Sequence, residues 1–592
     1  MVPFWRWLRS IAVGTLNGIL KFAFFLVLVG IVLVIVGLIE GDGLPRKIVL
    51  NLDLRTPIKD SASPSVLAIQ RSPTVLDIVL GLDRAGRDAR VKGVFIRLGS
   101  AALPIAQAEE LDAALTRFRQ SGKFVIAHSQ GFLSQGLGDY LTAASANEIW
   151  MQPKSPFGPA GTGGGGVFVR GLLDKIQAVP QIAKRAEYKS AADTLMEKQM
   201  TPPDREQLTA LMQSWYDTGT GAIAAMRKLA AKAVVATLQR SPQLAEDAQR
   251  ARLIDKTGYD DEAEGAARKR SGGAELVSIM DYVRATDSAS QSGGAPRVAL
   301  IAGSGDIVEG SAEHDGLLNN VNQIAGDDFA QAIRKATKDS SIKAILVRID
   351  SPGGSVSASD QILDALRKAR AAGKPVVVSM GALAASGGYY VSCDANKIVA
   401  EPGTITGSIG VLTGKVAIGK TLGLIGVTMD QVGIGKNALF DSEVSPYTPD
   451  QWANLNAQAD AIYADFLQKV SKGRDLPLTT VQNIAKGRVW SGSDARSKGL
   501  VDDLGGFWTA VADLKIAAGI PASQRVVFRR LPASRGFVQT ILDALDGTEA
   551  GVRAVEGLGV FTRIPVVRTV AESLSQAPQY GVQMRASNVL VQ

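Results

Sequence analysis

The feature of the sequence that most constrains its fold is an internal repeat. VKGVFIRLGS at residues 91–100 matches IKAILVRIDS at residues 342–351 in register, 251 positions later. After each apolar segment comes a stretch with helical periodicity that ends in Gly-Lys, at 108–123 and 359–374, and then a second apolar segment. Near-continuous apolar strands that alternate with helices are typical of parallel sheets covered by helices. The sequence therefore predicts an α/β protein built from two tandem copies of one unit.

The 592 residues are too many for a single core, and the repeat divides them. The linker between the copies is polar and rich in Gly and Ser, which is typical of an exposed connection. The last segment lies outside the repeat and contains amphipathic pieces that could pack on the core, mediate assembly or lie on a membrane. The predicted organisation is a cytoplasmic N-terminus at 1–21, a transmembrane anchor at 22–39, an N-terminal repeat at 48–285, a linker at 286–296, a C-terminal repeat at 297–525 and a C-terminal extension at 526–592.

An unbroken run of 18 apolar or Gly residues extends from Phe22 to Ile39. As a helix it would measure about 27 Å, close to the thickness of a bilayer core. Basic residues and no acidic ones precede it, so we expect the short N-terminus in the cytoplasm and the rest of the chain on the other side. A cleaved signal peptide is the alternative, but its apolar region normally spans about 7–15 residues. The length favours an uncleaved anchor in a lipid bilayer.

The scarcity of cysteine and histidine excludes several kinds of site. Cys393 is the single cysteine, which rules out an intramolecular disulfide and a multi-cysteine zinc site. His128 and His314 are the two histidines, and they leave little room for histidine-based metal chemistry. The four-glycine run at 163–166 lacks the Lys-Ser/Thr of a phosphate-binding loop. The net charge of +8 is modest for this length, and we expect no metal, no cofactor and no nucleic-acid partner.

The two copies differ at the positions where chemistry is expected. The second copy reads DSPGGS from Asp350, and two glycines between a strand and a helix let backbone N–H groups face a ligand, as in an oxyanion hole. In the first copy, Ala102 and Leu103 replace Gly353 and Gly354. The fold therefore does not need these glycines, which favours a functional role for them over a simple turn.

A serine in the second copy follows a run of small residues. Ser386 lies in AASGGYY at the start of a helix-like segment, where small neighbours leave space and the helix N-terminus supplies positive potential. Leu137 occupies the equivalent position of the first copy. A serine nucleophile needs a base. The residues alone leave His128, His314 and a lysine open, and a lysine acts as a base only if burial lowers its pKa from about 10.4 toward neutrality.

The motifs SPGGS, AASGGYY and TGSIG, together with RAEYKSAADTLMEKQMTP in the first copy, resemble the signal peptide peptidase A family. Over nearly its whole length the chain is similar to the long, membrane-anchored, tandem-repeat form, a Ser/Lys peptidase with the Clp protease/crotonase fold. The resemblance implies that Ser386 is the nucleophile and Lys189 the general base. It also implies that Gly354 and Gly387 donate to the oxyanion and that Ser408 orients the lysine amine.

A second lysine competes for the role of base. Lys436, in VGIGKNALFD, aligns with Lys189 when the copies are compared, and its spacing from Ser386 resembles that in half-length family members. Its surroundings lack the Tyr-Lys pair and the small residues found at Lys189, so we favour Lys189. Lys189 and Ser386 lie in different copies. They can therefore meet only where two repeats face each other, within one chain or between neighbours.

The resemblance implies a membrane-anchored serine endopeptidase that degrades signal peptides remaining in the membrane after secretion. It would lie in the bacterial inner membrane, with its catalytic domains on the extracytoplasmic side. Family members of this length form homotetrameric bowls whose active sites lie where the halves of neighbouring subunits meet. The expected partners are therefore signal peptides, lipid and further copies of the chain. Two alternatives are a crotonase-type enzyme acting on acyl thioesters and a non-catalytic membrane scaffold.

Overall fold

The computed structural model describes residues 42–61, 72–287, 294–311, 323–531, 583–585 and 590–591. Within these ranges, no helix combines the length and the apolar composition that a bilayer crossing requires. The predicted anchor at 22–39, His314 and most of the C-terminal extension lie outside the described residues.

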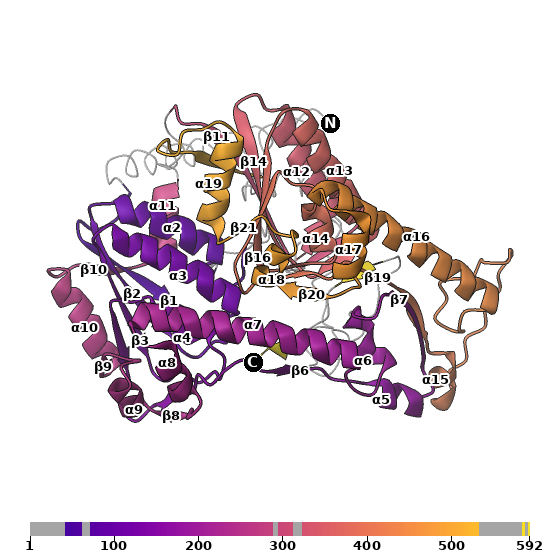
Figure 1. Cartoon of the computed structure of the whole chain (residues 1–592), viewed down its shortest axis with the longest axis horizontal. Helices are drawn as coiled ribbons and strands as arrows, with labels where there is room; N and C mark the ends of the chain where they lie inside the picture. Colours follow the sequence, from indigo (N-terminus) through magenta and orange to yellow (C-terminus); the bar gives the residue numbers. More distant parts are fainter. Residues whose placement is uncertain are drawn as a thin grey trace, which may run out of the picture.

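The first repeat forms a six-stranded sheet in which all neighbouring strands are parallel. Helices α2, α3 and α4 cover one face of this sheet, and α10 packs on the other (Figure 1). In spatial order the strands are β10 (Glu275–Ser278), β1 (Ile48–Asp53), β2 (Val91–Leu98), β3 (Phe124–Ser129), β4 (Glu148–Met151) and β9 (Lys256–Thr257). The helices are α2 (Val75–Arg87), α3 (Ile105–Gln120), α4 (Gly138–Ala144) and α10 (Asp260–Arg270).

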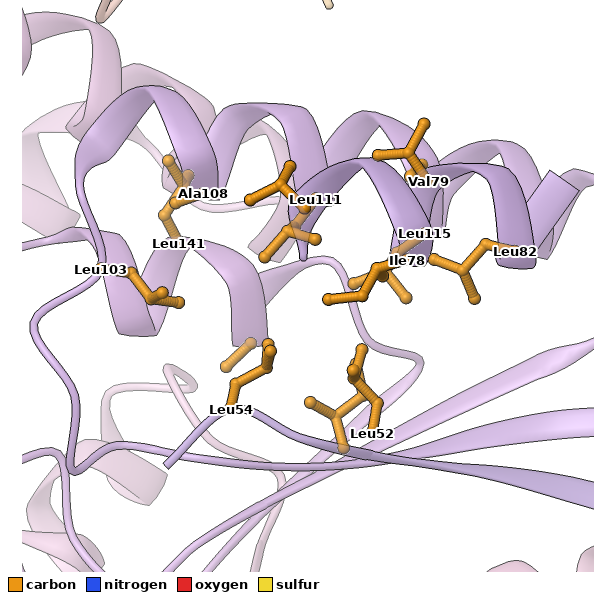
Figure 2. Close-up of a cluster of buried hydrophobic side chains, with 14 of the residues drawn as sticks. Leu52, Leu54, Ile78, Val79, Leu82, Leu103, Ala108, Leu111, Leu115 and Leu141 are labelled. Carbon is orange, nitrogen blue, oxygen red and sulfur yellow. The ribbon is translucent and has the colours of Figure 1, made fainter. Parts of the chain in front are cut away.

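The apolar core of this repeat lies between β1 and the helices α2, α3 and α4, as Figure 2 shows. Leu52 of β1 and the leucine two residues after it lie below Ile78 of α2 and Leu115 of α3, and all of these side chains are buried. Ile78 and Leu82 are four positions apart, so α2 presents one apolar face to the sheet. Burying each such side chain stabilises the fold by about 1.5–3 kcal/mol.

The second repeat has the same strand order as the first. The neighbours β11, β14, β16 and β17 correspond to β1, β2, β3 and β4, and the matching segments 91–100 and 342–351 form the equivalent strands β2 and β14. The predicted tandem α/β architecture is therefore confirmed. The strands are β11 (Arg297–Ser304), β14 (Ile342–Ser351), β16 (Val376–Ala385), β17 (Lys397–Ala400), β18 (Ile405–Gly407), β20 (Val489–Ser491), β21 (Asp503–Leu504) and β22 (Val527–Leu531).

The two repeats share a core through the second sheet. Along β14, Leu346 joins the core of the first repeat, whereas Ile345 and Val347 point to the opposite face, which α12 and α13 cover. A strand with both faces buried reads as a continuous apolar run, which is the pattern seen in the sequence. The helices of this repeat include α12 (Gly326–Lys338), α13 (Val356–Ala371), α14 (Gly387–Ser392), α16 (Pro449–Arg474), α17 (Leu478–Ile484), α18 (Gly492–Ser497) and α19 (Phe507–Ala517).

A third sheet joins the repeats directly. Strand β7 of the first repeat pairs with β19 of the second along seven antiparallel residue pairs, from Val411 with Arg185 to Ala417 with Val179. Nothing in the sequence pattern predicted this pairing between strands of different repeats. The sheet contains, in order, β13 (Gln323–Ala325), β12 (Asp306–Val308), β15 (Gly353–Ser355), β23 (Gln583–Arg585), β19 (Val411–Ala417) and β7 (Val179–Arg185).

The long helix α7 (Pro202–Arg227) also connects the repeats. It contacts α4 of the first repeat and β20 of the second, and in Figure 1 it crosses from the first repeat to below the second. Strand β22 pairs with β11, so the second sheet extends into the predicted C-terminal extension. The remaining elements are β5 (Pro156–Phe157), β6 (Gly164–Gly165), β8 (Gln243–Leu244), β24 (Leu590–Val591), α5 (Arg170–Lys175), a 3-10 turn (Ser190–Ala192), α6 (Asp193–Met196), α8 (Ala231–Leu238), α9 (Ala245–Arg250), α11 (Ile279–Asp287) and α15 (Gly419–Leu424).

Buried charges also lie between the repeats. Arg348 of β14 forms ion pairs with Asp60 at 2.6 Å and with Glu110 of α3 at 2.9 Å, and all three side chains are buried. Glu109, also on α3, accepts a hydrogen bond from the backbone N–H of Gly403 in the second repeat. Removing one partner of a buried ion pair typically destabilises a fold by about 3–5 kcal/mol. This cluster therefore makes docking of the repeats specific and sensitive to charge.

The stability of the protein should depend on pH through Glu109. Burial raises the pKa of Glu109 to about 8. A carboxyl group whose folded pKa is raised stabilises the fold below its unfolded pKa, and this contribution is lost as the pH rises through the folded value. Glu109→Gln keeps an acceptor for Gly403 and cannot ionise. We expect the melting temperature of this variant to fall less than that of the parent between about pH 4 and about pH 9, the interval that brackets both pKa values. Equal falls would contradict the assignment.

Candidate active site

Ser386 lies at the sharp turn between β16 and α14. Its backbone angles are φ 55° and ψ −113°, a strained conformation for a residue with a side chain. Two backbone hydrogen bonds fix the turn, because the Ser386 N–H donates to Gly407 O and the Ser386 carbonyl accepts from Tyr390 N–H, both at 2.8 Å. Its equivalent Leu137 is likewise the residue before a short helix, α4. The equivalent position thus carries a hydroxyl in one repeat and an apolar group in the other, and only the serine has the strained backbone, since Leu137 has φ −86° and ψ −19°.

Lys189 of the first repeat faces this serine. Its amine Nζ lies 2.7 Å from Ser386 Oγ and 3.0 Å from both Oγ and the backbone O of Ser408. Lys189 is 1% exposed, and this burial lowers the pKa of the amine well below its usual value of 10.5. A neutral amine at hydrogen-bond distance can accept the hydroxyl proton. The structure therefore brings together the serine, the lysine and the second serine that the resemblance singled out.

Two loops place the lysine. Strand β7 ends at Arg185, and Tyr188 then donates its N–H to the carbonyl of Lys486 in the second repeat at 3.0 Å. Gly487 packs against the lysine at φ +75°, and a Cβ on it would lie 2.7 Å from the Lys189 Cβ. A side chain there would displace the lysine backbone, so glycine is required.

The segment with Gly353 and Gly354, called the glycine loop here, lies next to the turn that carries Ser386. A Cβ on Gly387 would lie 3.1 Å from Gly354 N, so the two backbones are adjacent. Gly354 has a φ of +151°, and a side chain on it would meet Ile307 O at 2.1 Å. The N–H of Gly353 donates to Ser351 Oγ. The backbone N–H groups of Gly354 and Gly387 therefore lie close to each other, next to the turn that carries Ser386.

The edges of this site pair with an extended chain. Strand β23, from the C-terminal extension, lies between β15 and β19 and is antiparallel to both, with Gly354 opposite Met584 and Leu412 opposite Gln583. Strands β15, which contains the glycine loop, and β19 therefore present facing edges between which an extended strand pairs.

Two other candidate bases, Lys436 and His128, lie elsewhere. Lys436 is exposed and bonds Asp450 at 2.7 Å, an interaction that raises its pKa. His128 is a buried strand residue whose ring nitrogens lie 3.2 Å from Gly258 O and from a carboxylate oxygen of Asp260. Among the described residues, no group of three His, Cys, Asp or Glu side chains could hold a metal ion.

Lys189 and Ser386 meet within one chain, at the junction of its two repeats. This is one of the two arrangements that the sequence left open, within one chain or between neighbours. The sequence reasoning also missed Gln207 of α7, which bonds the residues on both sides of Lys189. Its segment, TPPDREQ, reads as an ordinary helix start, so only the folded contacts reveal it.

Comparison with known families agrees with this geometry. The model of "Peptidase family S49" matches residues 117–273 and 368–521, one segment in each repeat, and together they cover more than half of the chain. The chain belongs to peptidase family S49. The Clp protease model also matches residues 317–400 of this S49 peptidase.

Relatives of this S49 peptidase are named as proteases. "Serine protease SPPA, chloroplastic" of Arabidopsis thaliana is 30% identical, over 80% of this chain and 70% of its own length. "Protease 4" of Salmonella typhi is 32% identical, over 83% of this chain and 79% of its own. A protein of Enterococcus faecium with the provisional name of signal peptide peptidase SppA is 31% identical, over 32% of this chain and 55% of its own. The protein is a long SppA-type serine endopeptidase, which decides against the acyl-thioester enzyme and the scaffold.

Proposed function

We propose that this S49 peptidase cleaves peptide bonds with Ser386 as nucleophile and Lys189 as general base. The observation that carries the proposal is the 2.7 Å contact between the buried Lys189 amine and Ser386 Oγ. The neutral amine takes the hydroxyl proton while Oγ attacks the peptide carbonyl carbon. Gly354 and Gly387 donate backbone N–H groups to the oxyanion that develops.

The second half of the reaction uses the same groups. The protonated Lys189 returns its proton to the leaving amine, and the acyl group stays on Ser386 Oγ. Lys189, neutral again, then takes a proton from water while the water oxygen attacks the acyl carbonyl. It returns that proton to Ser386 Oγ as the ester bond breaks and the acid product leaves. Ser408 accepts hydrogen bonds from the amine through Oγ and its carbonyl, which hold the amine toward Ser386 in both steps.

The proposed substrates are signal peptides that remain in the membrane. An extended chain fits between β15 and β19, because β23 pairs with both strands there. The run at 22–39 would anchor the enzyme in the bacterial inner membrane, with both repeats on the extracytoplasmic side, where such peptides are within reach. The provisional name of the Enterococcus faecium relative supports this substrate class.

The proposed assembly is a homotetramer. The segment that follows β19 exposes several large apolar side chains, and Val432 and Ile434 are 90% and 97% exposed. Exposed apolar groups in one segment mark an interaction surface. A second copy of the chain is the partner that the resemblance implies for this surface. The apolar side chains concerned are Leu424, Ile425, Val427, Met429, Val432 and Ile434.

Substrate class is tested with the full chain in lipid nanodiscs. A synthetic signal peptide inserted in the same discs is compared with a water-soluble peptide that contains only its polar part, and products are identified by mass spectrometry. We expect cleavage of the inserted peptide at a rate at least about tenfold higher, because the anchor places enzyme and peptide in one bilayer. Ser386→Ala discs control for other proteases. Equal cleavage of both peptides would reject the membrane substrate and leave the peptidase activity intact.

A further inference from the structure

A buried glutamine side chain holds the segment that carries Lys189. Gln207 of α7 is 2% exposed. Its Nε2 donates to the Tyr188 carbonyl and lies 3.0 Å from Ser190 Oγ, so it contacts the residues before and after the lysine. The same nitrogen lies 3.0 Å from Asp204 Oδ1, one turn earlier on the helix. The residues on both sides of Lys189, one through its backbone carbonyl and the other through its hydroxyl, are therefore tied to one side chain.

The other end of this amide bonds the second repeat. Gln207 Oε1 accepts the N–H of Val489 in β20 at 3.1 Å. The preceding carbonyl, of Arg488, accepts the N–H of Ser408 at 2.7 Å. Strand β20 also pairs with β18, whose last residue, Gly407, accepts the Ser386 N–H. A single amide thus links the lysine segment to the strands that hold both serines.

We propose that Gln207 is a positioning residue that holds the Lys189 amine at Ser386 and keeps water away from it. A lysine side chain has four rotatable bonds, and its amine stays neutral only while it is buried. The lysine segment comes from the first repeat, whereas the groups it must face come from the second. The Gln207 amide fixes the position of one repeat's segment relative to the other. This inference rests on the proposed role of Lys189 and adds the group that makes that role possible.

The variant Gln207→Met tests the inference, because methionine keeps the length of the side chain and removes every hydrogen bond. We expect kcat near neutral pH to fall by about 10–100-fold, with KM within about twofold, since a misplaced catalytic group costs about this much without changing substrate contacts. We also expect the acidic limb of the kcat profile to move up by about one pH unit or more, because water that reaches the amine raises its pKa. Part of the lost activity should therefore return at alkaline pH.

Gln213→Leu is the matched control, since Gln213 is an exposed glutamine on the same helix. It should leave kcat and the pH profile unchanged. Gln207→Glu is the second variant, used if Gln207→Met does not fold. It keeps the acceptor for Val489 but turns an oxygen toward the Tyr188 carbonyl, and it should move the acidic limb in the same direction. Melting temperatures identify which variants are folded.

The outcomes separate this inference from the proposed function. If Lys189→Ala retains activity, the proposed dyad fails. If Lys189→Ala is inactive and Gln207→Met has parental kcat and an unmoved acidic limb, only the positioning role fails. A folded Gln207→Met that loses the same fraction of activity at every pH would also overturn it, because a merely structural defect does not shift the titration of the amine.

Discussion

Ser386→Ala is expected to lower the rate of peptide hydrolysis by roughly a thousandfold or more, because it removes the hydroxyl that faces the Lys189 amine at 2.7 Å. The fold should survive, since Leu137 occupies the equivalent position before α4 without a hydroxyl. Initial rates on a fluorogenic peptide and the melting temperature of the full chain measure the two effects. Turnover above a few per cent of the parent would remove Ser386 from the nucleophile role.

Ser392→Ala provides the matched control for this experiment. Ser392 lies in the same short helix, α14, is fully buried and donates its hydroxyl to the Gly388 carbonyl. Its substitution makes the same chemical change six positions after Ser386. The control should retain hydrolysis, so that a comparable loss in both variants would point to damage of α14 rather than to a missing nucleophile.

Lys189→Met is expected to be as damaging to hydrolysis as Ser386→Ala, because nucleophile and base act as one unit. Although the substitution should abolish hydrolysis, it should increase the free energy of unfolding near neutral pH. Burial lowers the folded pKa of the amine well below 10.5, so the unfolded chain binds one more proton between the two values and parental stability rises with pH in that interval. Methionine has no proton to lose. The variant should therefore unfold at a higher temperature than the parent near neutral pH, and this difference should shrink as the pH approaches about 10.

Two controls accompany Lys189→Met. Lys436→Met removes an exposed lysine and should leave hydrolysis nearly unchanged. Mixing Ser386→Ala and Lys189→Met chains should restore no activity, because the two side chains meet within one chain. Recovery of activity in the mixture would show that neighbouring subunits complete the site. A parental activity that rises only near pH 10 would show that the lysine amine is not desolvated.

The architecture could be predicted from the sequence because the two copies of the repeat can be aligned with each other. Two apolar segments in register, 91–100 and 342–351, became equivalent strands, β2 and β14. The pairing of β7 with β19 could not be predicted, because either strand could have paired inside its own repeat. The sequence of a short strand without a distinctive partner also does not define its register. The buried pair of Arg348 and Asp60 was equally invisible, since 288 positions separate two ordinary charges.

Some residues of the candidate site could be predicted from the sequence, and others could not. Ser386 and the glycines stood out because the first copy has Leu137, Ala102 and Leu103 in their places. Lys189 stood out only through the resemblance, because a lysine gives no sign of burial in a single sequence. Gln207 gave no signal at all, since its role depends on contacts with Tyr188 and Ser190 that only the folded chain reveals and on one with Val489 that forms only after the repeats dock.

The division of the proposed dyad between the repeats has a consequence for biosynthesis. A ribosome completes the first repeat long before it adds residue 386. During that interval β7 has no β19 to pair with, and Lys189 has no Gly487 or Ser408 packed against it. A lysine in contact with water carries its proton and cannot act as a base. The nascent chain is therefore harmless to its neighbours, and proteolysis begins only when the second half has been synthesised and has docked on the first.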